Sequence, residues 1–220
     1  MKRLMSFGAV ALSFVMLCVA ATRGAEPSTA EASKLPLLFS DDFEHGTDRW
    51  EPTDSAAWKL VPSRHGSAYS LFKQSKYKPP HRSPFNVSLV KGVVVSDFVF
   101  EADVLSTKPD YGHRDMCMVF GYQDPAHFYY VHFGKKTDDH ANQIFIVDGA
   151  DRLKISTKTT PGTNWDDAWH HVKIERNVAD GRIDVFYDDM EHPVMQAHHT
   201  KFTWGRSDWV RSTTSATGTT

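Results

Sequence analysis

Apolar and polar residues alternate in short runs along most of the chain after residue 37. The clearest run is residues 93–105, in which apolar side chains from Phe98 to Val104 alternate with Glu101 and Asp103. A period of two is typical of a β-strand with one packed face and one wet face. We therefore predict a half-buried strand here, with the two carboxylates on its outer face.

Further strands follow the same pattern. We predict them at residues 116–122, 127–134, 143–147, 153–156, 169–175 and 182–187. Asp-Pro at 124–125 and Asp-Gly at 180–181 mark short connections, so neighbouring strands are expected to pair as antiparallel hairpins. No stretch of useful length has the helical period. Regular short strands without helices indicate an all-β sandwich or barrel.

The first 21 residues have the composition of a signal peptide. A positive Met1-Lys2-Arg3 precedes an apolar stretch that ends in small residues at Ala21. The stretch is too short for a bilayer core, which needs about 20 apolar residues, so no stable membrane span is expected after cleavage. Residues 22–36 are rich in Ala, Ser, Glu, Thr and Pro and are predicted to form a flexible leader. The protein is therefore predicted to be secreted or periplasmic.

Composition narrows the picture further. The chain has 220 residues and a formal net charge of −2 at pH 7, so bulk charge gives no indication of nucleic-acid binding. Residues 37–206 suit one domain. Cys117 is the only cysteine outside the predicted signal peptide and cannot form an internal disulfide. Its apolar neighbours predict a buried core thiol.

Four motifs in order resemble the concanavalin A-like, laminin-G-like jelly-roll superfamily. They are Asp41-Asp42-Phe43-Glu44 with Gly46 and Trp50, Phe98–Asp103, Val119–Asp124 with His127–Phe133, and Trp169–Glu175 with Arg182–Asp188. The resemblance covers residues 37–206 and implies an antiparallel jelly-roll sandwich. The superfamily contains lectins, sugar-binding modules, glucanases and polysaccharide lyases, so the resemblance implies a carbohydrate ligand without fixing an activity.

The end of the chain departs from this pattern. Residues 207–220 are rich in Ser and Thr, and we expect them to form a disordered tail that contributes no core strand. We interpret this as a missing or altered final strand. Some relatives build a calcium site from acidic residues at both ends of the domain, and Asp41 and Asp42 would be half of one. No other cofactor is expected, and the histidine spacings give no zinc site.

The densest polar window lies between residues 111 and 143. From it we select six candidate ligand-binding residues: Arg114, Tyr130, His132, Lys135, His140 and Asn142. Alternation places Tyr130 and His132 on one strand face, which we expect to be solvent-accessible and to line a concave groove. Tyrosine rings stack on pyranose rings, and the polar groups hydrogen-bond to hydroxyls or to the carboxylate of an acidic sugar.

Three classes of function stay open on this evidence. The first is a carbohydrate-binding module that recognises a polysaccharide. The second is an enzyme in the same groove, either a polysaccharide lyase that uses Tyr130 and His132 or a glycoside hydrolase that uses Glu101 and Asp103. Of the two, the lyase is favoured, because the glucanase motif has a third carboxylate that this chain lacks. The third is a structural adhesion domain on a cell surface.

Overall fold

The computed structural model describes residues 35–64, 66–112, 114–207 and, as a short strand, 212–214. Its strands are β1 (Trp50–Pro52), β2 (Trp58–Ser63), β3 (Gly66–Leu71), β4 (Ser88–Val90), β5 (Phe98–Ser106), β6 (Asp115–Asp124), β7 (His127–Gly134), β8 (Gln143–Asp148), β9 (Leu153–Lys154), β10 (Ser156–Thr159), β11 (His170–Asn177), β12 (Arg182–Tyr187), β13 (Met195–His198) and β14 (Ser212–Thr214). The described residues contain no α-helix, only the 3-10 turn η1 (Ser55–Ala57). The predicted signal peptide and residues 22–34 of the predicted leader lie outside the described residues.

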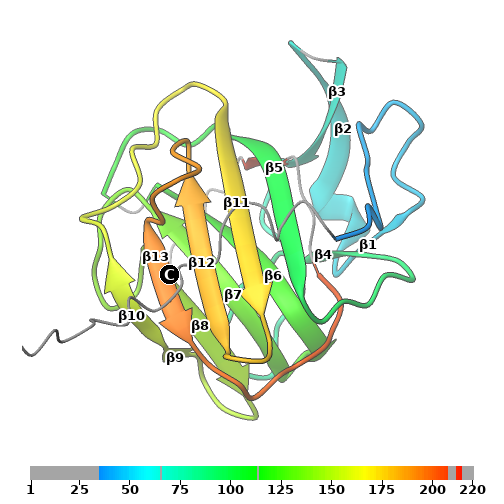
Figure 1. Ribbon diagram of the computed structural model, residues 1–220. Coiled ribbons are helices and arrows are strands. Elements are labelled where there is room, and N and C mark those ends of the chain that lie inside the picture. The colour runs from blue at the N-terminus through cyan, green and yellow to red at the C-terminus, as the bar shows by residue number, and fades with distance from the viewer. Residues whose placement is uncertain (1–34, 65, 113, 208–211, 215–220) are drawn as a thin grey trace, which may run out of the picture.

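Two sheets form a sandwich (Figure 1). The larger sheet has the order β10-β13-β12-β11-β5-β14-β3-β2, and the smaller has the order β6-β7-β8-β9. β1 and β4 form a separate two-stranded sheet. Except for those of β14, the pairings are antiparallel, so the predicted all-β antiparallel sandwich is confirmed.

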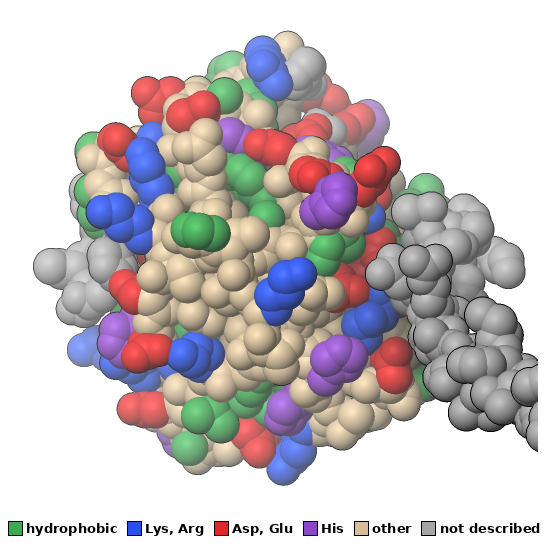
Figure 2. Space-filling view, turned by 60° about the vertical axis from the view of Figure 1, so that its left-hand side comes forward, with side chains coloured by type: hydrophobic (Ala, Val, Ile, Leu, Met, Phe, Trp, Pro, Cys, Tyr) green, Lys and Arg blue, Asp and Glu red, His purple; other side chains and the backbone are tan. Residues whose placement is uncertain are grey.

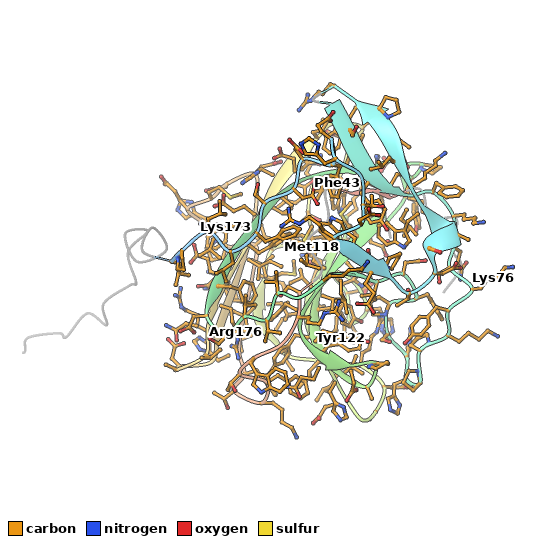
Figure 3. The ribbon with its side chains drawn as sticks, turned by 90° about the vertical axis from the view of Figure 1, so that its right-hand side faces the viewer. Phe43, Lys76, Met118, Tyr122, Lys173 and Arg176 are labelled. Carbon is orange, nitrogen blue, oxygen red and sulfur yellow. The ribbon has the colours of Figure 1, made fainter. Side chains whose placement is uncertain are left out.

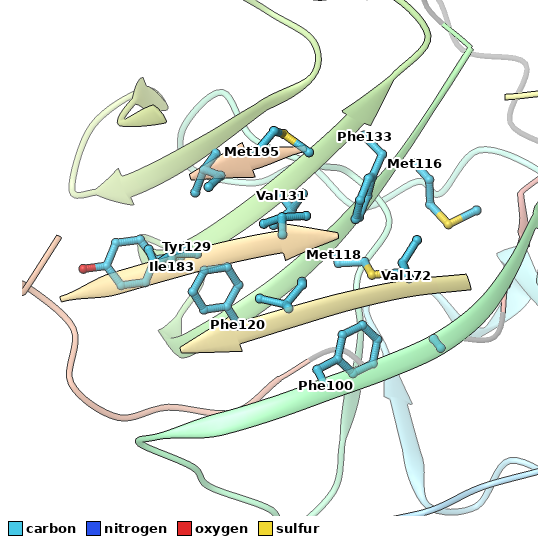
Figure 4. Packing of buried hydrophobic residues seen from close by; sticks show 14 of the residues in the cluster. Phe100, Met116, Met118, Phe120, Tyr129, Val131, Phe133, Val172, Ile183 and Met195 are labelled. Atoms are coloured by element: carbon cyan, nitrogen blue, oxygen red, sulfur yellow. The ribbon is translucent and has the colours of Figure 1, made fainter. Parts of the chain in front are cut away.

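The main core fills the space between the two sheets (Figure 4). The alternation in β5 works as predicted, because Phe98, Phe100 and Val104 are buried there while Glu101 is exposed. The strand begins at Phe98 rather than Val93, since pairing with β11 ends at Phe98. Val95 instead makes a single bridge to Gly205. Burial of large apolar side chains on both inner faces is the main force that holds the layers together.

The outer face of the smaller sheet is also covered. Residues 72–87, between β3 and β4, run over it, and we call them the covering segment. Val87 and Leu89 form a second buried cluster with side chains of the smaller sheet, namely Val119, Phe128, Tyr130, Phe145 and Val147. The smaller sheet therefore has a packed core on both of its faces.

The two ends of the domain are built differently. Residues 41–46 form a turn, because Asp41 and Asp42 each accept a hydrogen bond from the backbone N–H two residues on. The tail was expected to contribute no core strand. Residues 212–214 nevertheless form β14, whose backbone pairs in parallel with β3 and β5 and joins the two parts of the larger sheet. Residues 208–211 and 215–220 of the predicted tail lie outside the described residues.

Candidate functional site

Tyr130 was expected to be an exposed sugar platform, and this is wrong. Its side chain is 0% exposed and stacks on Phe145, with ring centroids 5.0 Å apart. Its hydroxyl accepts a hydrogen bond from Arg152 Nη1 at 2.9 Å. Burial raises the pKa of this phenol well above its ordinary value. Tyr130 therefore cannot contact a substrate, and a lyase mechanism that uses it as acid or base has no support.

His132 and Arg114 are also held inside the protein. His132 is 8% exposed, and its Nε2 lies 2.7 Å from Asp115 Oδ2. Arg114 is 2% exposed, and its guanidinium donates to Ser106 and to Asp167. The guanidinium of Arg114 is buried, and its Nε and Nη2 atoms are bonded within the protein, so it is not presented to a ligand at the surface.

The other three candidates lie near the same end of the smaller sheet. Asn142 is 0% exposed and has a φ of 55°, and its amide donates to Thr137 Oγ1. It therefore shapes a turn. Lys135 forms an ion pair with Asp110, and His140 is exposed. Only Lys135 and His140 of the six predicted residues are accessible to a ligand.

Sequence reasoning missed Arg152, which links this region together. Besides its bond to Tyr130, its guanidinium lies 4.7 Å from the centre of the Phe145 ring and donates to the His140 carbonyl. Its backbone N–H donates to the Arg82 carbonyl of the covering segment. Arg152 stands in a turn with no periodic pattern, so only the folded structure reveals its neighbours.

Asp41, half of the calcium half-site that the resemblance implied, forms hydrogen bonds within the protein. Asp41 Oδ1 accepts from the Phe43 N–H, and Asp41 Oδ2 accepts from Trp50 Nε1 at 2.8 Å. Both oxygens therefore serve the local fold. Among the described residues, no group of three or more His, Cys, Asp or Glu side chains could hold a metal ion.

A cleft of the described structure lies elsewhere, along the edge of β5. Its volume is about 530 Å³. Residues 35–41 form one wall, residues 97–103 form the other, and His171 of β11 lies at its rim. The first wall is apolar at Leu37 and Leu38, which are 82% and 57% exposed.

Aromatic contacts fix the wall at residues 35–41. Phe39 packs edge-on against Trp50, and the Arg49 guanidinium lies 3.9 Å from the centre of the Phe39 ring. Arg49 also donates to the Ser40 carbonyl. Together with the bond from Trp50 to Asp41, these contacts hold the wall in place beside β5.

The polar groups of the cleft come from two adjacent strands. Asp103 Oδ1 lies 2.8 Å from His171 Nδ1, and Glu101 Oε2 lies 4.0 Å from His171 Nε2. The three side chains are between 39% and 55% exposed. Residues two apart on a strand face are about 6.5–7 Å apart, so the imidazole lies between two carboxylates at the cleft rim.

The lining of the cleft carries negative charge. Its lining contains four carboxylates, from Asp41, Asp97, Glu101 and Asp103, and neither lysine nor arginine. Asp97 accepts a hydrogen bond from the Val178 N–H, whereas Glu101, Asp103 and His171 form one polar group at the cleft rim. Carboxylates and a histidine beside an apolar wall can bond hydroxyl groups and contact carbon-bound hydrogens, but they repel an anion.

The sequence contained part of this signal. Alternation placed Glu101 and Asp103 together on the outer face of β5, as the structure does. In the structure His171 points toward Asp103, while its neighbour His170 lies against Asp188. The register of β5 against β11, which pairs Asp103 with His171, could not be read from the sequence.

Comparisons with known proteins add a fold likeness only. No family model matches the chain, and no curated protein matches it. Among solved structures, the carbohydrate-binding module CBM66 from Bacillus subtilis is similar at 18% identity with a TM-score of 0.49, and the match covers 72% of this chain and 84% of that one. This likeness assigns neither a family nor a ligand, so the concanavalin A-like relationship stays a prediction. Within the described residues, no helix is long and apolar enough to cross a membrane.

Proposed function

We propose that this protein binds a neutral glycan in the cleft along β5. The observation that carries the proposal is the open cleft of about 530 Å³ in which an apolar wall faces Glu101, Asp103 and His171. Ligand sites are typically concave and largely apolar, with a few convergent polar groups. The predicted export is part of the proposal, because it would bring the cleft into contact with extracellular polysaccharide.

The chemistry of the cleft favours a neutral sugar over an acidic one. Carboxylates accept hydrogen bonds from sugar hydroxyls, and bonds to charged groups are stronger than those between neutral groups. An acidic sugar would bring its own carboxylate to a lining that has no lysine or arginine. The proposed binding surface is therefore the cleft and not the predicted groove around Tyr130.

The binding test is a comparison of two matched variants. Glu101→Gln removes one cleft charge, whereas Glu191→Gln removes the charge of an exposed glutamate in the turn between β12 and β13. Titration calorimetry against dextran, xylan and mannan should identify a bound glycan, for which Glu101→Gln lowers the affinity about tenfold. Glu191→Gln should change it less than about twofold. Equal affinities in the two variants would disprove the assignment to the cleft.

Glycoside hydrolysis is a second candidate function, and one observation favours it. Paired carboxylates about 5–10 Å apart are the catalytic groups of glycoside hydrolases, and Glu101 and Asp103 meet that spacing. A hydrolase would release new reducing ends from the bound glycan, and Asp103→Asn would abolish their release. If the glycan is bound and no new reducing ends appear, hydrolysis is excluded and only the binding function is supported.

A further inference from the structure

The second region of interest is marked by its charge. Residues 55–96 contain no Asp or Glu but seven lysines and arginines, namely Lys59, Arg64, Lys73, Lys76, Lys78, Arg82 and Lys91. Four of them lie in the covering segment, and all four are exposed. A chain with a net charge of −2 thus concentrates positive charge on one surface.

None of these four cations, the side chains of Lys73, Lys76, Lys78 and Arg82, belongs to a described ion pair. Two carboxylates beside the segment bind its backbone, since Asp54 accepts from the Lys76 N–H and Asp151 accepts from the Arg82 N–H. The charges of Lys73 and Lys76 also help to lower the Asp54 pKa, after the hydrogen bond from the Lys76 N–H. Figure 3 shows Lys76 at the outer side of the covering segment, away from Lys173 and Arg176 of the larger sheet.

Arg152 extends this surface onto the smaller sheet. Its backbone is bonded to Arg82, its guanidinium is fixed by Tyr130 and Phe145, and no described carboxylate lies within ion-pair distance of it. The positive charge of Arg82 also reaches Tyr130, where it opposes the rise of the phenol pKa. The arginines at 82 and 152 thus lie on neighbouring turns above a single buried ring.

The covering segment is held in one shape and carries an exposed aromatic ring. Ser75 N–H donates to Asn86 Oδ1 across the segment, and prolines at 79, 80 and 84 restrict its backbone. Phe85 is 42% exposed among the cations. A fixed surface loses little conformational entropy on binding, and an exposed ring can stack on a sugar face.

We propose that the covering segment and Arg152 form a second binding site, which takes a polyanionic polysaccharide. Arginine donors match carboxylate and sulfate groups in a two-pronged geometry, and the lysines add positive charge along the chain. A membrane surface is a poorer match, because Phe85 is the only large apolar side chain of the segment that is exposed and the segment has no amphipathic helix. This site is independent of the cleft, whose charge has the opposite sign.

The test compares two double variants that lose the same charge. Lys76→Gln with Arg82→Gln alters the proposed site, and Lys158→Gln with Lys201→Gln alters other surfaces. Lys158 lies on β10. The face of the molecule in Figure 2 carries acidic and basic side chains interspersed along its margin. All four side chains are exposed, and unchanged thermal unfolding midpoints should confirm that both variants fold.

Polygalacturonate and dextran sulfate are the probes, with dextran as the uncharged counterpart. The native protein should bind both polyanions. The first double variant should lose about tenfold in affinity, and the second less than about twofold. Equal losses would overturn the proposal, as would tighter binding to phosphatidylglycerol vesicles or single-stranded DNA than to either polyanion. Glu101→Gln should leave polyanion binding intact, so failure here is separate from failure of the cleft.

Discussion

The cleft along β5 and the covering segment differ in almost every physical respect. The cleft is lined by carboxylates without a lysine or arginine, whereas residues 55–96 carry lysines and arginines without a carboxylate. Averaged over the chain, these charges nearly cancel. A net charge near zero therefore says little about a protein whose two signs are separated in space.

The two regions also differ in how they are attached to the core. Glu101 and Asp103 project from a regular strand whose other face is buried, so their side chains contribute little to packing. The covering segment is irregular and is held by the buried cluster around Tyr130 and by Arg152. Changes beneath the covering segment should thus cost stability, while changes in the cleft should affect ligand binding alone.

The largest expected effect is the removal of the ring beneath the covering segment. Tyr130→Ala should lower the free energy of unfolding by about 3–5 kcal/mol, because it leaves a cavity in a fully buried cluster. Glu101→Ala, at an exposed position, should change it by less than about 0.5 kcal/mol. Urea unfolding followed by tryptophan fluorescence measures both. A similar loss of unfolding free energy in the two variants would contradict the difference in packing between the two regions.

The next expected effect is a different salt dependence of the binding affinity at the two sites. Raising NaCl from about 0.05 M to 0.5 M shortens the screening length well below 10 Å and should weaken dextran sulfate binding by about tenfold or more. Neutral glycan binding in the cleft should change less than about twofold, because it involves no net charge on the ligand. Calorimetric titrations at both salt concentrations give the comparison. A parallel loss at both sites would mean that the cleft also depends on ionic attraction.

A smaller effect isolates the link between Arg152 and the buried ring. Tyr130→Phe keeps the ring but removes the acceptor of the 2.9 Å bond, and should cost about 1–2 kcal/mol of unfolding free energy. The free guanidinium should then become more mobile and polygalacturonate binding should weaken. Hydrogen exchange of the amides in the covering segment would detect the loosening. Unchanged exchange and unchanged affinity would show that Arg152 needs no anchor.

The sequence predicted regular parts of the molecule well and irregular parts poorly. Alternation located β5, β7 and β12 and correctly assigned Glu101 to an outer face, because a period of two is a direct readout of burial on one side. The same alternation assigned Tyr130 to the outer face of its strand, which is also correct. Alternation did not predict that this face is buried, because the covering segment, which is distant in the sequence, lies over it.

The cleft could not be predicted from the sequence, for a related reason. It is formed by an irregular segment at residues 35–41 against the edge of β5, and the residues that bring them together are Phe39, Arg49 and Trp50. None of these contacts has a periodic signature. Long-range pairing of irregular segments depends on side-chain packing that one sequence does not reveal.

The last expected effect is confined to alkaline pH. Tyr122 lies at the edge of the buried cluster beneath the covering segment, and burial, followed by the nearby Tyr77, raises its pKa to about 12. In the unfolded chain the phenol has a pKa of about 10. Below pH 10 both states hold the proton and stability is unaffected. Between pH 10 and 12 the unfolded chain releases the proton more readily, so the stability contribution is lost as the pH rises.

Tyr122→Phe should therefore make the free energy of unfolding fall less steeply between pH 10 and 12 than in the native protein. Urea unfolding at a series of alkaline pH values measures the slope, and absorbance of tyrosinate reports the ionisation itself. The cleft lining contains no tyrosine, so glycan binding should keep its affinity up to pH 10. A variant with the native slope would show that Tyr122 ionises as freely in the folded protein as in the unfolded chain. Its ring would then be wet and would not belong to the covered cluster.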